Sequence, residues 1–214
     1  TLAANALAWH NATASRQSVV YDRAFCLDGK FVTVHYPGVV SQSSDGATWT
    51  SSQTGTTDTI KDLVHGNGRY VALVAVLAGG GSFNYVLRTS ADGTTWSTPT
   101  LPAEAATARL AAILFANGKF TAIAVGLNGS FGAQVLGSTD GTSWVSQAAS
   151  TFWNDVGMLA YGNGVYVAVG GVVQVSTDGT TWTMPITSQT PPNRLRFVNG
   201  QFFMVGNNGL IRTS

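Results

Sequence analysis

The sequence predicts an all-β chain made of five similar units, each with four antiparallel strands. Two repeated signals lead to this prediction. A Ser-x-Asp-Gly-x-x-Trp motif occurs four times, and an Asn-Gly or Asp-Gly pair between apolar runs occurs five times. Turn signals that recur about every 40 residues are typical of repeat folds built from β-hairpins.

The first turn of each unit is a two-residue pair. The five pairs are Asp28-Gly29, Asn67-Gly68, Asn117-Gly118, Asn163-Gly164 and Asn199-Gly200. Such pairs favour a type I′ hairpin, in which both central residues need a positive φ. An aromatic residue follows each glycine two positions later: Phe31, Tyr70, Phe120, Tyr166 and Phe202. We therefore expect a strand on each side of every pair.

The second turn of each unit is the Ser-x-Asp-Gly-x-x-Trp motif. Its glycine supplies a positive φ, its aspartate can accept hydrogen bonds from backbone N–H groups across the turn, and its serine can tie down the strand end. The tryptophan begins the outgoing strand and offers a large face for packing between sheets. We expect a structural role for the aspartate and tryptophan of each copy: Asp45, Trp49, Asp92, Trp96, Asp140, Trp144, Asp178 and Trp182.

The spacing of the tryptophans predicts how the units close. The steps from Trp9 are 40, 47, 48 and 38 residues, and joining the chain ends gives a fifth step of 41. The repeats are therefore approximately 10–49, 50–96, 97–144, 145–182, and 183–214 together with 1–9. We predict that residues 1–214 form one five-bladed β-propeller domain, in which an N-terminal strand around Trp9 pairs with the C-terminal blade. This strand closes the ring and removes an open sheet edge.

The second-turn motif resembles the Asp box of bacterial-neuraminidase-type repeats, whose usual form is Ser-x-Asp-x-Gly-x-Thr-Trp. Here one residue is missing between aspartate and glycine, so the motif is a shortened variant. Asp boxes occur in β-propellers of unrelated activity, so the resemblance implies a fold and little chemistry. In blade number the chain is similar to five-bladed propeller lectins of the tachylectin-2 kind.

Composition excludes several classes of function. Only 10% of the residues are charged and the net charge is +1, which argues against a nucleic-acid surface. No apolar run has the length of a membrane span, so we expect no membrane insertion. The three histidines show no metal-ligand spacing, and we expect neither a metal nor a cofactor. Low charge with abundant Ser, Thr and Gly favours an extracellular, cell-surface or virion-associated protein. The oligomeric state stays open.

A ligand site is expected on the face opposite the turns, which we call the loop face. It carries the loops between second and third strands and the connections between blades, which vary in length and sequence. The candidate ligand-binding residues are Tyr36, Phe83, Tyr85, Phe131, Trp153, Asn154 and Asp155. Trp153 beside an amide and a carboxylate suits a sugar, although Phe152 and Trp153 could also fill a gap between blades.

Charged residues near the start of each innermost strand could line the central channel. They are Asp22, Arg23, Lys61, Asp62, Arg109, Asp155, Arg194 and Arg196. Their signs are mixed, so we expect them to pair with one another.

The favoured hypothesis is a noncatalytic propeller that binds carbohydrate through the loop face, as a lectin does. One alternative is a structural or adhesion module of a virion, tail or cell surface, which would bind a surface protein through an apolar patch around Phe83, Tyr85 and Phe131. A second is a glycoside hydrolase that uses inner-strand carboxylates. Hydrolysis needs two carboxyl groups that flank the bond, and Asp22, Asp62 and Asp155 could converge for this purpose.

Overall fold

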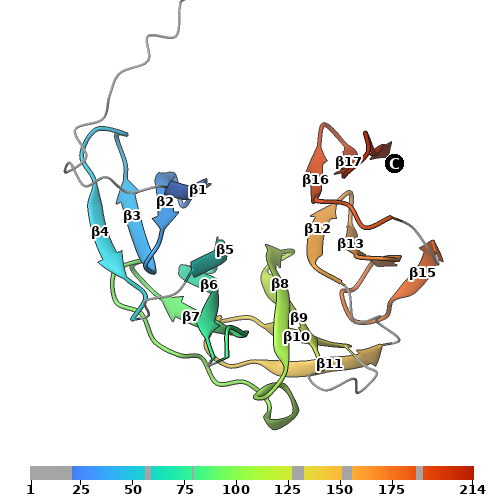
Figure 1. The fold of residues 1–214 in the computed structure, drawn as a ribbon, viewed down its shortest axis with the longest axis horizontal. Coiled ribbons are helices and arrows are strands. Elements are labelled where there is room, and N and C mark those ends of the chain that lie inside the picture. Colours follow the sequence, from blue (N-terminus) through green and yellow to red (C-terminus); the bar gives the residue numbers. More distant parts are fainter. Residues whose placement is uncertain (1–20, 56–58, 79, 127–132, 151–155, 187–189) are drawn as a thin grey trace, which may run out of the picture.

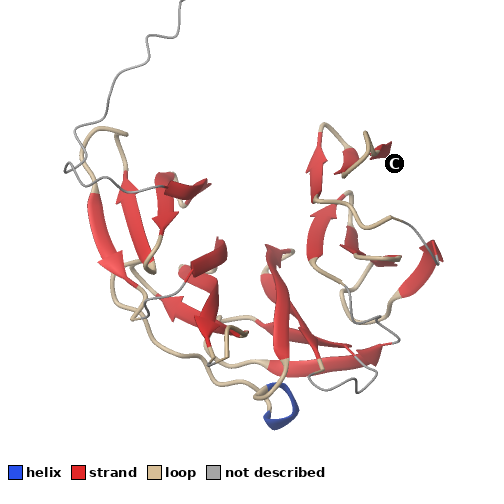
Figure 2. Cartoon of the chain, in the orientation of Figure 1, coloured by secondary structure: helices blue, strands red, loops and turns tan. Residues whose placement is uncertain are grey.

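The computed structural model describes residues 21–55, 59–78, 80–126, 133–150, 156–186 and 190–214. These residues are almost entirely strand and turn, with one short 3₁₀ helix, η1 (Ala103–Ala105) (Figure 2). Within them, no helix has the length and apolar character that a membrane span needs.

The strands form five small antiparallel sheets that follow one another around a common centre (Figure 1). The first sheet contains β1 (Tyr21–Leu27), β2 (Lys30–His35), β3 (Val39–Ser43) and β4 (Thr50–Gln53). The second contains β5 (Thr59–Gly66), β6 (Arg69–Leu77) and β7 (Phe83–Ser90). The third contains β8 (Arg109–Ala116), β9 (Lys119–Val125), β10 (Ala133–Ser138) and β11 (Val145–Ser150). The fourth contains β12 (Met158–Gly162), β13 (Val165–Val169), β14 (Val173–Ser176) and β15 (Thr183–Ile186). The fifth contains β16 (Arg194–Val198), β17 (Gln201–Val205) and β18 (Ile211–Thr213).

This arrangement is a five-bladed β-propeller, as the sequence predicts. Within each sheet, consecutive strands are hydrogen-bonded neighbours. The innermost strands β1, β5, β8, β12 and β16 lie side by side in this order around the centre. Each innermost strand therefore begins on the loop face and runs towards the turn face.

The first turns have the backbone that the Asn-Gly and Asp-Gly pairs predict. The first residue of each pair has a φ between 47° and 53°, and the glycine that follows has a φ between 66° and 79°. Two positive φ values in succession define a type I′ turn, whose twist matches that of the flanking strands. The turn residues also join neighbouring blades: the Asn67 side-chain amide donates to the carbonyl oxygens of Gly118 and Thr139, both at 2.8 Å.

The four second turns share one hydrogen-bond pattern. In the turn of Asp140, the Oδ1 atom accepts from the backbone N–H groups of Thr142 (2.8 Å) and Ser143 (2.9 Å) and from the Ser138 hydroxyl (3.0 Å). The Ser138 hydroxyl in turn accepts from the N–H of Gly141. These hydrogen bonds hold the pKa of the Asp140 carboxyl well below its usual range, and the other three aspartates are affected in the same way: Asp45, Asp92 and Asp178.

The hydrophobic core consists of four clusters, one between each pair of consecutive sheets. Val32 and Val34 of the first sheet pack with Ile60 and Leu63 of the second, and similar clusters follow to the fifth sheet. Trp144 is buried in the cluster between the second and third sheets, with its ring 6.3 Å from that of Phe120. Among the described residues, no such cluster joins the fifth sheet to the first.

The aromatic residue after the first turn is fully buried in the second, third and fourth blades and half-buried in the fifth, where it is Phe202. Tyr70, Phe120 and Tyr166 are at most 1% exposed. Phe31 of the first sheet occupies the equivalent position and is 51% exposed. Its strand, β2, belongs to the first sheet, which borders the open side of the ring in Figure 1. The N-terminal strand expected to close the ring, around Trp9, lies outside the described residues.

Among the described residues, two of the five sheets have three strands instead of the expected four. In the second sheet, the outermost strand is reduced to a single bridge between Thr89 and Ser97. Pro99 has no N–H to continue this pairing, and the next residue, Thr100, bonds instead to Thr142 and Trp144 in the second turn of the third blade. In the fifth sheet, the fourth strand is expected from N-terminal residues that lie outside the described part of the chain.

Candidate functional site

A cavity of about 540 Å³ lies at the centre of the ring, where the innermost strands begin. In every blade, the residue five positions before the Asp or Asn of the first turn faces this centre. It is occupied by Arg23, Asp62, Ala112, Met158 and Arg194. The other lining residues are Lys61, Leu73, Tyr85, Arg109, Ala111, Ile113, Gly157, Leu159, Pro192, Asn193, Leu195 and Arg196. The cavity therefore collects side chains from all five sheets on the loop face.

Three of the innermost strands carry an irregularity in register beside the cavity. In β5 the pairing jumps from Ile60 to Asp62, so that Lys61 is an extra residue, and β1 and β8 have equivalent jumps at Asp22 and Ala111. Bulges of this kind break the strict alternation of side chains between the two faces of a strand. Both Lys61 and Asp62 therefore line the cavity, although they are neighbours in the sequence.

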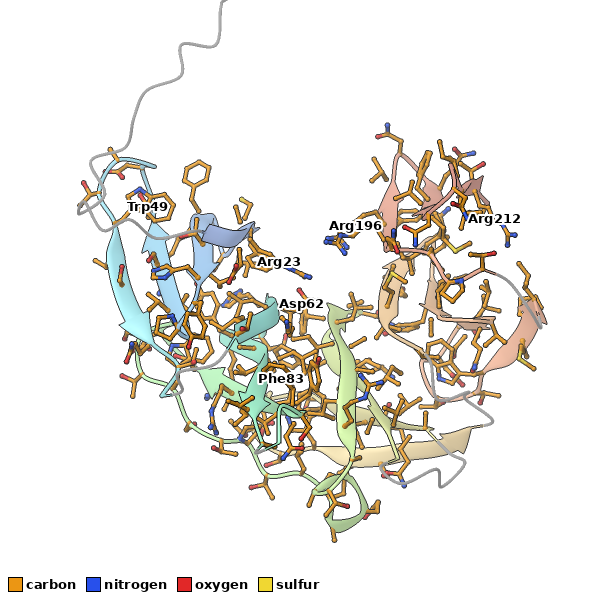
Figure 3. The ribbon with its side chains drawn as sticks, viewed as in Figure 1. Arg23, Trp49, Asp62, Phe83, Arg196 and Arg212 are labelled. Atoms are coloured by element: carbon orange, nitrogen blue, oxygen red, sulfur yellow. The ribbon has the colours of Figure 1, made fainter. Side chains whose placement is uncertain are left out.

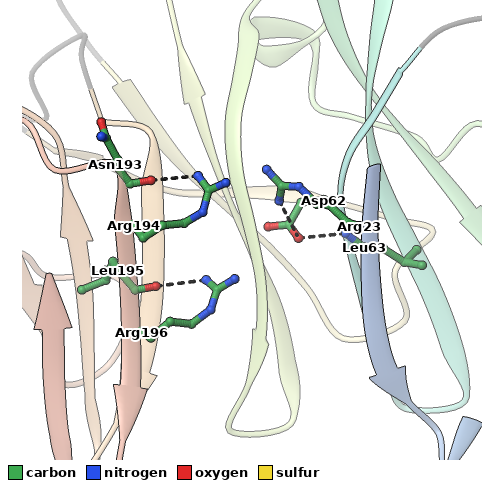
Figure 4. A network of polar contacts seen from close by, with 7 residues as sticks. All are labelled: Arg23, Asp62, Leu63, Asn193, Arg194, Leu195 and Arg196. Atoms are coloured by element: carbon green, nitrogen blue, oxygen red, sulfur yellow. Dashed lines mark hydrogen bonds and ion pairs between the residues drawn. The ribbon is translucent and has the colours of Figure 1, made fainter. Parts of the chain in front are cut away.

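Asp62 and Arg23 form an ion pair on one side of the cavity, with 3.9 Å between Oδ1 and Nη1 (Figure 4). The same carboxylate oxygen accepts from the backbone N–H of Leu63 at 3.0 Å. Both side chains are a little more than a third exposed. Burial in the concave site raises the pKa of the Asp62 carboxyl. The hydrogen bond from Leu63 and then the positive charges of Arg23, Arg196 and Arg194 only partly oppose this effect.

Arg194 and Arg196 face this pair from the fifth sheet (Figure 4). They are two residues apart on β16, so both side chains leave the same side of the strand. Each guanidinium donates through Nη1 to the carbonyl oxygen of the preceding residue, Asn193 at 2.8 Å and Leu195 at 3.0 Å. Arg196 points into the central space in the wider view, as Arg23 does (Figure 3). These contacts orient the two guanidinium groups and leave several of their five N–H donors for a ligand.

The wall that the third and fourth sheets contribute to the cavity is largely apolar. The third and fourth sheets contribute Ala112, Ile113, Met158 and Leu159, which carry no charge. Where the second and third sheets meet at the cavity, the Arg109 guanidinium lies over the ring of Tyr85, 5.6 Å from its centroid. This distance is within the range of a cation–π interaction, which fixes both side chains at the edge of the cavity.

The sequence-derived ligand candidates divide into three groups. Tyr85 lines the cavity. Phe83 and Tyr36 do not line it, and they are 50% and 62% exposed. The remaining candidates lie outside the described residues: Phe131, Trp153, Asn154 and Asp155.

The structure confirms that most of the charged residues near the inner strand starts reach the centre. Six of the eight line the cavity: Arg23, Lys61, Asp62, Arg109, Arg194 and Arg196. The expected pairing occurs between Arg23 and Asp62, but the described lining holds five basic residues and one acidic residue. The extra residue of the β1 irregularity, Asp22, is exposed and is not part of the lining, and Asp155 lies outside the described residues.

The four second-turn aspartates are far from this site. They lie on the turn face, whereas the cavity lies where the inner strands begin, on the loop face. In the described part of the chain, no three His, Cys, Asp or Glu side chains gather closely enough to hold a metal ion. Within this part, the cavity is thus the place where charged groups from different blades meet.

Comparisons with known proteins support the fold. No protein-family model and no curated protein sequence matches the chain. Among solved structures, the computationally designed protein Ika8 has a TM-score of 0.62 at 13% identity, with 95% of this chain and 60% of that one covered. The extracellular domain of a one-component system from B. thetaiotaomicron has a TM-score of 0.64 at 14% identity, with 96% and 28% covered. A gluconolactonase from Xanthomonas campestris has a TM-score of 0.58 at 10% identity, with 86% and 68% covered. The chain thus spans 60% and 28% of the first two structures, and at these identities the likeness concerns the fold alone.

Proposed function

We propose that this protein is a noncatalytic propeller that binds a carbohydrate in the central cavity at its loop face. The observation that carries the proposal is the cavity itself, with a charged side and an apolar side in a volume of about 540 Å³. Ligand sites are concave, and most range from about 300 to 1,000 Å³. A sugar ring presents C–H groups on its faces and hydroxyls at its rim, so it matches such a lining.

Specific groups are placed for such a ligand. The Asp62 carboxylate and the Asn193 side chain can bind hydroxyl groups, while Met158 and Leu159 can pack against a C–H face. The fold is shared with the gluconolactonase, and this likeness favours a carbohydrate-related ligand. We also propose that the second turns are Asp boxes of a shortened form. The hydrogen bonds that their four aspartates share support this assignment.

Binding is favoured over hydrolysis by the count of carboxylates. Hydrolysis of a glycosidic bond requires two carboxyl groups, about 5 to 9.5 Å apart, on either side of the bond. The described lining contributes one, Asp62, and it is already paired with Arg23.

The test is a glycan-array screen of the purified chain, run beside two variants of one strand. Tyr85→Ala changes the cavity, and Phe83→Ala removes an aromatic ring two residues away that lies outside it. We expect binding to a defined set of glycans that Tyr85→Ala weakens and Phe83→Ala leaves unchanged. Absence of glycan binding, or binding that only Phe83→Ala affects, would contradict the proposal.

A second candidate function is adhesion to a protein surface. Leu77 and Phe83 are directly opposite each other at the end of the β6–β7 hairpin, and they are 61% and 50% exposed. An exposed apolar pair of this kind suits a protein partner. Adhesion of protein-coated beads to cells would distinguish the two functions. Protein docking predicts adhesion that survives enzymatic removal of surface glycans and falls with Phe83→Ala, whereas carbohydrate binding predicts loss with the glycans and no effect of Phe83→Ala.

A further inference from the structure

Resting on the proposed function, we propose that the carbohydrate is acidic and that Arg194 and Arg196, with Arg23 across the cavity, bind its carboxylate or sulfate group. The two anions share the chemistry that guanidinium groups recognise, since each presents oxygen atoms that accept paired N–H donors. Uronic acids and sulfated sugars are therefore the ligand class.

The first argument is the distribution of charge. The chain has 11 basic and 10 acidic residues and a net charge of only +1. Five of those 11 basic residues line one cavity, where the described residues supply a single carboxylate. Most acidic residues of the described chain thus lie away from the centre, and a positive potential remains there. Low-dielectric walls focus such a potential and raise the local concentration of anions.

The second argument is the geometry of the arginine pair. Arg194 and Arg196 leave β16 on the same side, and each is held by a hydrogen bond to a backbone carbonyl oxygen. Neutral carbonyls orient the guanidinium groups without neutralising their charge. Both residues are exposed, so a ligand can reach the remaining donors. Because these planar guanidinium groups are already oriented, they lose little conformational freedom when they bind a carboxylate or sulfate.

The third argument is the position of the other groups. Figure 4 shows the Asp62–Arg23 pair across from the two arginines, and the apolar residues lie on the third and fourth sheets. An acidic sugar can place its anionic group between Arg194, Arg196 and Arg23. Its hydroxyls then reach Asp62, and one C–H face rests on Met158. A neutral sugar would leave the arginine donors without a charged partner.

The test uses side-chain NMR signals of arginine in the full chain during titration with four probes. The probes are glucuronate, glucose 6-sulfate, glucose and acetate. We expect glucuronate, glucose 6-sulfate or both to bind about tenfold or more tightly than glucose and acetate, because charge-assisted hydrogen bonds are the strong ones. The difference between the first two probes tells a carboxylated ligand from a sulfated one.

Three single variants locate the site. Arg194→Gln and Arg196→Gln should each weaken binding of the acidic sugar about tenfold. Arg212→Gln, a matched loss of one positive charge on β18, is outside the cavity lining and should leave binding within about twofold, since distant surface charges are screened. Equal effects of all three variants would mean nonspecific attraction and would overturn the inference.

The probes separate failure of this inference from failure of the proposed function. Glucose binding as tightly as the tighter of the two acidic sugars would overturn the inference and leave carbohydrate binding intact. Acetate binding as tightly as the tighter of the two acidic sugars would overturn carbohydrate binding, while the anion site would stand. Absence of binding by all four probes would overturn both.

Discussion

Truncation of Phe120 to alanine should destabilise the protein far more than the same change at Phe31. The two residues hold the same position after the first turn of their blades. Phe120 is fully buried between the second and third sheets, whereas Phe31 of the first sheet is 51% exposed. The pair therefore measures how much one interface between blades contributes to stability.

The expected magnitudes follow from burial. Loss of a fully buried phenylalanine ring costs about 3 to 5 kcal/mol, because the transfer term and the cavity term add. At Phe31 about half of the apolar surface is already in water and no enclosed cavity forms, so we expect about 1 kcal/mol. The difference between the two variants is then about 2 to 4 kcal/mol by the same reasoning.

Urea unfolding followed by tryptophan fluorescence and by circular dichroism measures both values. Assuming a slope of about 3 kcal/mol per molar urea for a chain of this size, the midpoint should fall by more than about 1 M for Phe120→Ala and by about 0.3 M for Phe31→Ala. Coincident transitions by the two probes justify the comparison. Equal midpoint losses would refute the reasoning, since they would mean that Phe31 is covered in solution as Phe120 is.

Three further predictions concern the turns and the close approaches between blades. Gly162→Ala should lower the midpoint of thermal unfolding, because its β-carbon would lie 2.2 Å from the Phe197 ring, and Phe197→Leu should partly restore it; an unchanged midpoint would contradict this packing. Asn67→Asp keeps a residue that tolerates a φ of 47° but removes the amide donor to Gly118 and Thr139, so urea unfolding should show a loss of about 1 to 2 kcal/mol and not a gain. The lowered pKa of the second-turn aspartates contributes stability that is fully present above their ordinary pKa of 3.8 and is lost as the pH falls below it. Unfolding midpoints between pH 7 and pH 2 should show this loss, and Asp140→Asn should reduce it.

The fold was predictable because its signals are local. A positive φ at Asn163 and Gly164 follows from the two residues themselves, and the hydrogen bonds of Asp140 stay within four residues of it. Repetition of such signals at a regular spacing then predicts the number of blades. The outer strand around Ser97 was less predictable, because Thr100 pairs with the third sheet and only the assembled fold brings the two together.

The site was only partly predictable, because it depends on distant residues. The turn signals locate the beginning of each innermost strand. Arg23, Asp62 and Arg194 lie at these beginnings in the sequence, which is enough to place them near the centre. The balance of charge could not be predicted in this way. A register jump at Asp22, which no turn signal marks, decides which charged side chain of β1 lines the cavity.

The two faces of the propeller carry different kinds of information. On the turn face, the second turn repeats the same serine, aspartate, glycine and tryptophan in four blades, and the aspartate makes the same hydrogen bonds each time. At the centre, one equivalent position holds Arg23, Asp62, Ala112, Met158 and Arg194 in the five blades. The fold tolerates arginine, aspartate, alanine and methionine at that position, so blade formation alone does not require the arginines. Residues that the repeat does not require, yet that converge on one cavity with mostly one sign of charge, are therefore the ones on which the proposed ligand site depends.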